Sequence, residues 1–117
     1  MTKITLLLLV LMAMISPLLG ADLTGIWTAG VVLDAGTGSA TFTFKQTGEM
    51  LSGTYSGVLG TSTVSGAVKG EKVEWSFDSG QAGKVSYTGV LEGEAKIAGT
   101  VVYGSLGSGT FTAEKKK

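Results

Sequence analysis

The chain has 117 residues, with nine lysines balanced by nine acidic residues, and it contains no arginine, histidine or cysteine. Its zero formal net charge argues against nucleic-acid binding, which usually needs a basic excess and bidentate arginine contacts. The missing histidine and cysteine exclude disulfides, a histidine general base, a thiolate nucleophile and a zinc site of the usual nitrogen and sulfur type.

Residues 1–20 have the pattern of a secretory signal peptide. Lys3 precedes an apolar stretch, 4–15, which is followed by a proline and small residues. This stretch is shorter than the roughly 20 residues that span a bilayer. We therefore predict cleavage after Gly20 or Ala21 and an extracytoplasmic protein, either periplasmic or secreted. The alternative is an uncleaved segment, which would be the protein's one membrane contact.

The rest of the chain, 21–117, predicts a single domain built from eight β-strands. Apolar and polar residues alternate with period two, and glycine-rich turns separate the alternating runs. The turns are short, which favours an up-and-down meander. We place the strands at residues 24–33, 39–46, 50–58, 62–69, 72–78, 83–91, 95–103 and 107–114.

One face of these strands collects apolar side chains, and the other collects serine, threonine and charged side chains. A step of Ser, Thr or Ala followed by Gly, any residue and an apolar residue recurs six times, so these glycines share the apolar face. Such a division fits an antiparallel sheet that is wetted on one side. All nine aromatic residues lie on the apolar face: Trp27, Phe42, Phe44, Tyr55, Trp75, Phe77, Tyr87, Tyr103 and Phe111.

Closure of the sheet would remove the two edges that an open sheet must protect. The predicted fold is therefore an all-β, eight-stranded antiparallel up-and-down β-barrel. Glycines on the inner face would relieve crowding and let the strands coil where the barrel closes.

Carboxylates are the acid–base groups that remain for catalysis. Glu71, Glu92 and Glu94 fall in predicted turns, and Glu74 falls on the outer face, so we expect these carboxylates to be solvated surface groups. We therefore expect a non-enzymatic protein with no catalytic residues, no metal site and no cofactor.

Five inner-face side chains carry polar atoms that need partners once they are buried. Their partners could be one another, the backbone, water or a ligand. An eight-stranded barrel is just wide enough for its own side chains or for one small molecule, so a filled core and a ligand pocket both remain open. The candidate ligand-binding residues are Tyr55, Trp75, Tyr87, Trp27 and Tyr103.

Four strand motifs resemble those of avidin and streptavidin, which are calycin-type small barrels. Leu23–Trp27 is similar to the family's Thr-Gly-x-Trp strand and Leu51–Tyr55 to its Thr-Gly-Thr-Tyr strand. Val73–Trp75 is similar to its Val-x-Trp strand and Thr110–Thr112 to its closing strand. The resemblance implies an up-and-down barrel, commonly tetrameric, that binds biotin at its open end. The Gly-x-Trp opening is also found in lipocalins and fatty-acid-binding proteins.

The resemblance also implies roles for individual residues. Tyr55 matches the tyrosine that donates to the biotin ureido oxygen, Trp75 matches a tryptophan of the ligand wall, and Tyr87 falls where another wall tryptophan lies. The long loop that carries a tryptophan to a neighbouring subunit is missing. Because lost hydrogen bonds in a buried site cost about 1–3 kcal/mol each, the resemblance implies the fold and not tight biotin binding. Three further positions lack the family's polar or aromatic residues: Ala29, Val101 and Gly109.

These observations favour an exported, non-enzymatic barrel that binds a small, partly apolar ligand at one mouth. The alternative is a filled structural or interaction barrel, such as an envelope subunit or an inhibitor, that acts through its outer surface. Either form could be a homo-oligomer. Nucleic acid is not an expected partner.

Overall fold

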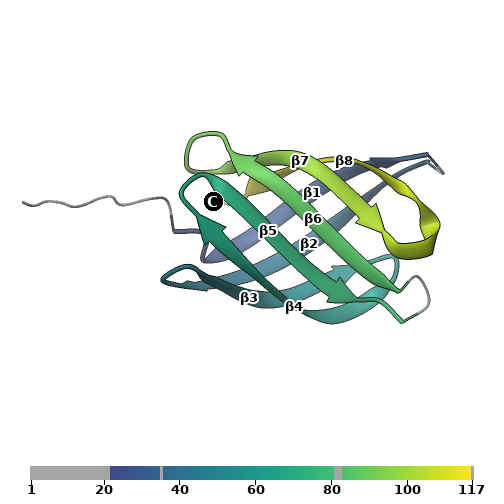
Figure 1. The fold of residues 1–117 in the computed structure, drawn as a ribbon, viewed down its shortest axis with the longest axis horizontal. Helices are drawn as coiled ribbons and strands as arrows, with labels where there is room; N and C mark the ends of the chain where they lie inside the picture. The colour runs from purple at the N-terminus through teal and green to yellow at the C-terminus, as the bar shows by residue number, and fades with distance from the viewer. Residues whose placement is uncertain (1–21, 35, 81–82, 117) are drawn as a thin grey trace, which may run out of the picture.

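The computed structural model describes residues 22–34, 36–80 and 83–116, which form one closed antiparallel β-barrel (Figure 1). The predicted signal segment, 1–20, lies outside the described residues. The strands are β1 (Gly25–Leu33), β2 (Gly36–Thr47), β3 (Met50–Gly57), β4 (Gly60–Lys69), β5 (Lys72–Asp78), β6 (Lys84–Leu91), β7 (Lys96–Tyr103) and β8 (Ser108–Lys115), with a short 3-10 helix, η3 (Gly104–Leu106), before the last strand.

The topology confirms the predicted up-and-down barrel. Each strand pairs with the next one along the chain, and β1 closes the barrel by pairing with β8, from Trp27 opposite Lys115 to Leu33 opposite Gly109. No described residue belongs to a helix long and apolar enough to cross a membrane.

Most strand boundaries agree with the prediction to within one or two residues, but β2 begins earlier than expected. The glycine-rich segment 36–38, which we expected to be a loop, extends β2 and pairs with the end of β1. Glycine lowers strand propensity because it has no side chain to pack, but its backbone still forms the hydrogen-bonded ladder when a partner strand lies beside it.

The division into two faces is also confirmed. All nine aromatic side chains are buried, and so is every other apolar residue that we placed on the inner face. The core also includes Leu23, Ala40, Leu51 and Ala113, which share the same parity or flank a strand. The described residues include no buried polar or charged residue.

Inner-face glycines allow close approach of neighbouring strands. A Cβ atom on Gly66 would lie 2.0 Å from the carbonyl oxygen of Glu74, and one on Gly109 would lie 1.8 Å from that of Val32. Real Cβ atoms do not approach backbone so closely. These positions therefore require glycine because the strands coil tightly there, as the recurring glycine step predicts.

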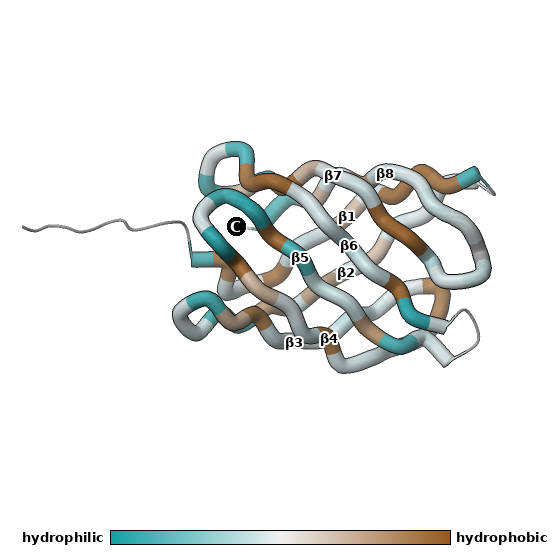
Figure 2. Tube along the Cα trace, in the orientation of Figure 1, coloured by the Kyte–Doolittle hydropathy of each residue, from teal (hydrophilic) through white to brown (hydrophobic). Residues whose placement is uncertain are grey.

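The two ends of the barrel differ in composition (Figure 2). We call one the charged end; it holds both ends of the described chain and the turns at 47–50, 69–72 and 91–96, which are rich in Glu and Lys. We call the other the tyrosine end; it holds the turns at 33–36, 57–60, 78–84 and 103–108. Its turns are mainly glycine, small and apolar residues, and its described charges are Asp34, Asp78 and Lys84.

Candidate functional site

The barrel interior is filled by its own aromatic side chains. Trp75 stacks on Tyr87 with ring centroids 5.0 Å apart, and Tyr55 stacks on Phe77 at 4.2 Å. Phe42 lies between these stacks, 5.3 Å from Trp75 and 5.1 Å from Tyr87. Of the two arrangements that the sequence left open, the interior is therefore the packed core, and any ligand space lies at the ends or outside.

Trp27 lies apart from the other predicted site residues, at the charged end. Its indole Nε1 donates a hydrogen bond to the carbonyl oxygen of Leu23 at 2.9 Å. The backbone N–H of Leu23 in turn donates to Oε1 of Gln46 at 2.9 Å. Leu23, just before β1, and Trp27, within β1, are both completely buried, so they close the barrel at this end. Trp27 therefore helps to seal this end.

The tyrosine hydroxyls converge toward the opposite end. The hydroxyls of Tyr87 and Tyr103 are hydrogen-bonded at 2.8 Å, and Tyr103 is the last residue of β7. The hydroxyl of Tyr55 accepts a hydrogen bond from the backbone N–H of Leu59 at 3.3 Å, in the β3–β4 turn. The structure thus brings together Tyr55, Tyr87 and Tyr103, with Trp75 stacked beneath Tyr87.

Burial shifts the acidity of two of these hydroxyls. Desolvation raises the pKa of Tyr87 far above its usual value, and its hydrogen bond to Tyr103 raises it further. Desolvation also raises the pKa of Tyr103, while the hydrogen bond from Tyr87 partly opposes that rise. Either hydroxyl of this pair can be the donor, and the nearby Tyr55 hydroxyl also raises the pKa of Tyr103.

Trp75 carries the remaining polar atom of the predicted site. Its Nε1 is buried and has no hydrogen-bond partner among the described residues. A buried donor without a partner costs about 1–3 kcal/mol, so a water or ligand acceptor reaching this atom would be stabilised.

A small hollow opens at the tyrosine end. Its volume is about 170 Å³. Sequence reasoning placed Tyr103 and Val31 on the inner face but missed the contribution of the turns. The signal was the Gly57-Val58-Leu59-Gly60 segment, where a turn tip that is usually polar carries two apolar residues and leaves Val58 85% exposed. Residues lining the hollow include Val31, Leu33, Gly38, Ser39, Val58 and Tyr103.

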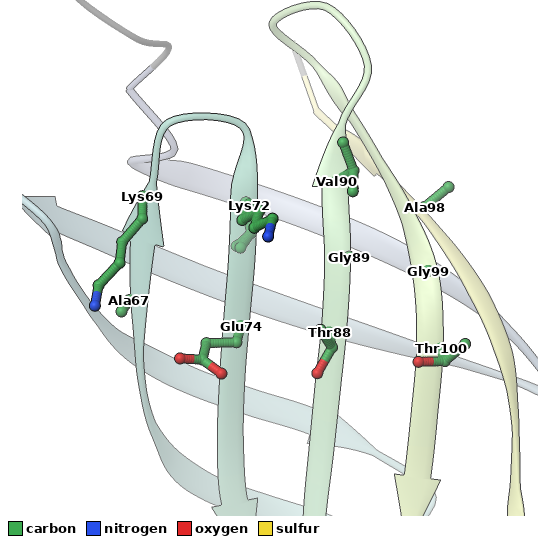
Figure 3. A pocket seen from close by; sticks show the side chains of 11 residues that line it. Ala67, Lys69, Lys72, Glu74, Thr88, Gly89, Val90, Ala98, Gly99 and Thr100 are labelled. Carbon is green, nitrogen blue, oxygen red and sulfur yellow. The ribbon is translucent and has the colours of Figure 1, made fainter.

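A larger hollow lies outside the barrel, on the outer face of β4–β7 (Figure 3). Its volume is about 380 Å³. Lys69 and Lys72 lie at its edge near the charged end, and Thr88 and Thr100 lie farther along the strands. The sequence predicted that these lysines and threonines would be exposed on the outer face, but it did not predict a hollow there.

The glutamates considered as acid–base candidates lie at the surface. Glu71, Glu74, Glu92 and Glu94 are all exposed, as the sequence predicted, and Glu92 forms a 3.8 Å ion pair with Lys96 at the surface. No group of metal-ligating side chains occurs within the described residues.

No family model matches the chain, and no curated protein matches it. Among solved structures, the barrel is similar to a redesigned β-barrel, mFAP1, determined bound to DFHBI, with a TM-score of 0.57 and 14% sequence identity. The similarity covers 80% of this chain and 94% of that one. The protein is thus a small eight-stranded antiparallel barrel of the kind that the avidin resemblance implies, and the similarity at this identity concerns the fold.

Proposed function

We propose that this protein is an exported, non-enzymatic barrel that binds a small, partly apolar ligand at the tyrosine end. The observation that carries the proposal is that Tyr103, whose hydroxyl is hydrogen-bonded to Tyr87, lines a mainly apolar hollow. Small-molecule sites usually combine apolar walls with a few convergent polar groups, and groups with perturbed pKa values gather in them. Tyr103 supplies a hydroxyl at the rim, and Val31, Leu33 and Val58 supply apolar parts of the walls.

The hollow sets the size of the ligand. Its volume of about 170 Å³ is below that of most drug-sized sites but close to that of an apolar cavity that holds one benzene ring. The ligand is therefore a single-ring compound, or one ring of a larger molecule, with a polar group that forms a hydrogen bond with the Tyr103 hydroxyl.

Two other features support the proposal. The redesigned barrel of the same fold was determined bound to a small molecule, DFHBI. Export rests on the signal-like segment 1–20, and the absence of enzymatic activity rests on the missing histidine and cysteine together with the exposed carboxylates.

The test is native mass spectrometry of the protein recovered from its own extracytoplasmic compartment. We expect a co-purifying small-molecule mass, which disappears in Tyr103→Phe and in Val58→Asp. Val102→Asp is the matched control, because Val102 is 50% exposed but lies on the outer face, and it should keep the ligand. Protein that carries no small molecule, or a ligand retained by both mouth variants, would contradict the proposal.

A second candidate function is that of an interaction barrel acting through its outer surface. The observation that favours it is the filled interior together with apolar side chains exposed on the outer face, including Ile26 at 43% and Val32 at 55% on β1. Light scattering on the purified protein tests this candidate. We expect an oligomer that Ile26→Lys with Val32→Lys dissociates, and a monomer that retrieves no envelope partner would contradict it.

A further inference from the structure

The outer hollow over β4–β7 results from small residues at adjoining positions. Gly89 on β6 lies opposite Gly99 on β7, and a Cβ on Gly99 would lie 2.0 Å from the carbonyl oxygen of Thr88. The two strands therefore approach closely and bend the sheet. Ala98, the outward neighbour of Gly99 on β7, and Ala67, on β4, are too small to fill the space above these strands.

Side chains of opposite charge line different parts of this hollow. Lys69 and Lys72 lie directly opposite each other on β4 and β5, an arrangement of like charges that is unfavourable without an anion. Glu74 lies on the same face of β5, about 6.6 Å along the strand from Lys72 at 3.3 Å per residue. Neither lysine nor Glu74 has an ion-pair partner within 4.0 Å among the described residues.

We propose that the outer hollow binds a small zwitterion, a molecule that joins an anionic and a cationic group through a short apolar body. The anionic group lies between the ammonium groups of Lys69 and Lys72. The cationic group lies against the Glu74 carboxylate, and the apolar body covers Gly89, Gly99 and Ala98. A ligand with a single charge would leave either the opposed lysines or Glu74 without a partner.

The shape of the hollow distinguishes this occupant from a second copy of the chain. A two-fold axis through this face would also bring lysines of one copy near Glu74 of the other. It would, however, set two hollows of about 380 Å³ against each other, and such voids forfeit packing contacts. A small molecule fills the space and satisfies the same charges.

The test is a titration of the ¹⁵N-labelled protein with 6-aminohexanoate, hexanoate and hexylamine, followed by amide shifts. We expect shifts confined to β4–β7. The affinity should be highest for 6-aminohexanoate, by up to about fivefold over a singly charged compound for each ion pair that it adds. Lys69→Gln with Lys72→Gln should reduce its affinity to that of hexylamine for the native protein. Glu74→Gln should reduce it to that of hexanoate. Ala98→Leu should fill the hollow and abolish binding of all three compounds.

Two control variants keep the test specific. Lys45→Gln removes an exposed lysine from β2, and Val102→Leu enlarges an outward side chain on β7 beyond the hollow, so both should bind as the native protein does. Equal affinities for the three compounds, no shifts with any of them, shifts at the tyrosine end, or full binding by Ala98→Leu would overturn the proposal. The result is independent of mouth binding, because Val58→Asp leaves this hollow intact.

Discussion

The two ends of the barrel are built from the same short hairpins, yet one is sealed and the other is open. At the charged end, Leu23 and Trp27 fold over the opening, and their polar atoms bond to each other and to Gln46. At the tyrosine end, Tyr103, whose hydroxyl is hydrogen-bonded to that of Tyr87, lines a hollow together with the exposed Val58.

This difference shows that the strand residues and the turn residues determine different properties of the barrel. The period-two pattern of the strands specifies the barrel, whereas the turn residues decide what each end exposes. Interior packing tolerates little change, while an exposed rim tolerates much. We therefore expect substitutions at the sealed end to affect stability and substitutions at the open rim to affect binding.

Trp27→Ala should have the largest effect on stability. Trp27 is completely buried, and large-to-small substitutions of buried tryptophan typically cost about 3–5 kcal/mol. Urea unfolding should therefore show a fall of that size in the free energy of unfolding. A fall below about 1 kcal/mol would mean that the charged end is not the sealed end.

Gly109→Ala should be the next most destabilising change, by about 1–3 kcal/mol or more, because its Cβ would meet the carbonyl oxygen of Val32 at 1.8 Å. Gly38→Ala is the matched control at the same end of the barrel, since nothing lies within 4 Å of its added Cβ. The midpoint of urea unfolding should fall for the first variant and stay near the native value for the second. Equal effects would contradict the close approach of β8 to β1.

Alkaline pH should destabilise the tyrosine end. The pKa values of Tyr87 and Tyr103 are raised in the folded protein, whereas unfolded tyrosine titrates near about 10. The unfolded chain therefore releases these protons first, so this contribution to stability is complete below about pH 10 and is lost as pH rises toward the folded values. Melting temperatures measured by circular dichroism should therefore fall between about pH 9 and about pH 12, a range that brackets the pKa of free tyrosine.

The variant Tyr87→Phe with Tyr103→Phe is the control for this pH dependence. It removes both shifted hydroxyls and should flatten the fall in melting temperature above about pH 10. An unchanged slope would assign the alkaline transition to other groups.

Val58→Ser should have the smallest effect, within about 0.5 kcal/mol of the native stability, because Val58 is 85% exposed. Chemical denaturation measures this change. A large loss of stability would mean that the β3–β4 turn closes the tyrosine end as Leu23 and Trp27 close the other.

The sequence predicted most of the fold because its strongest signal is local. The alternation of Trp27, Ala29 and Val31, for example, requires only the period of a β-strand to place these residues on one face. Short turns then pair each strand with its neighbour. β2 starts earlier than its residue pattern predicts, because β1 pairs with 36–38 although glycine has a low strand propensity.

The candidate sites depended on distances that no local pattern contains. The alternation pattern places Trp27 on the same inner face as the tyrosines, but it does not say at which end of the barrel each residue lies. The strand register places Trp27 at the opposite end from Tyr103. The outer hollow similarly requires small residues on β4, β6 and β7 to come into register.

The sequence by itself thus determined the strand order and the inward and outward faces, because these follow from alternation and short connections, whereas the structure decided that the interior is filled. Only the tertiary structure decided which inward polar atoms meet, which end is sealed and where the surface is hollowed. These features depend on the stagger and coiling of strands around a closed barrel, which the whole set of pairings determines together.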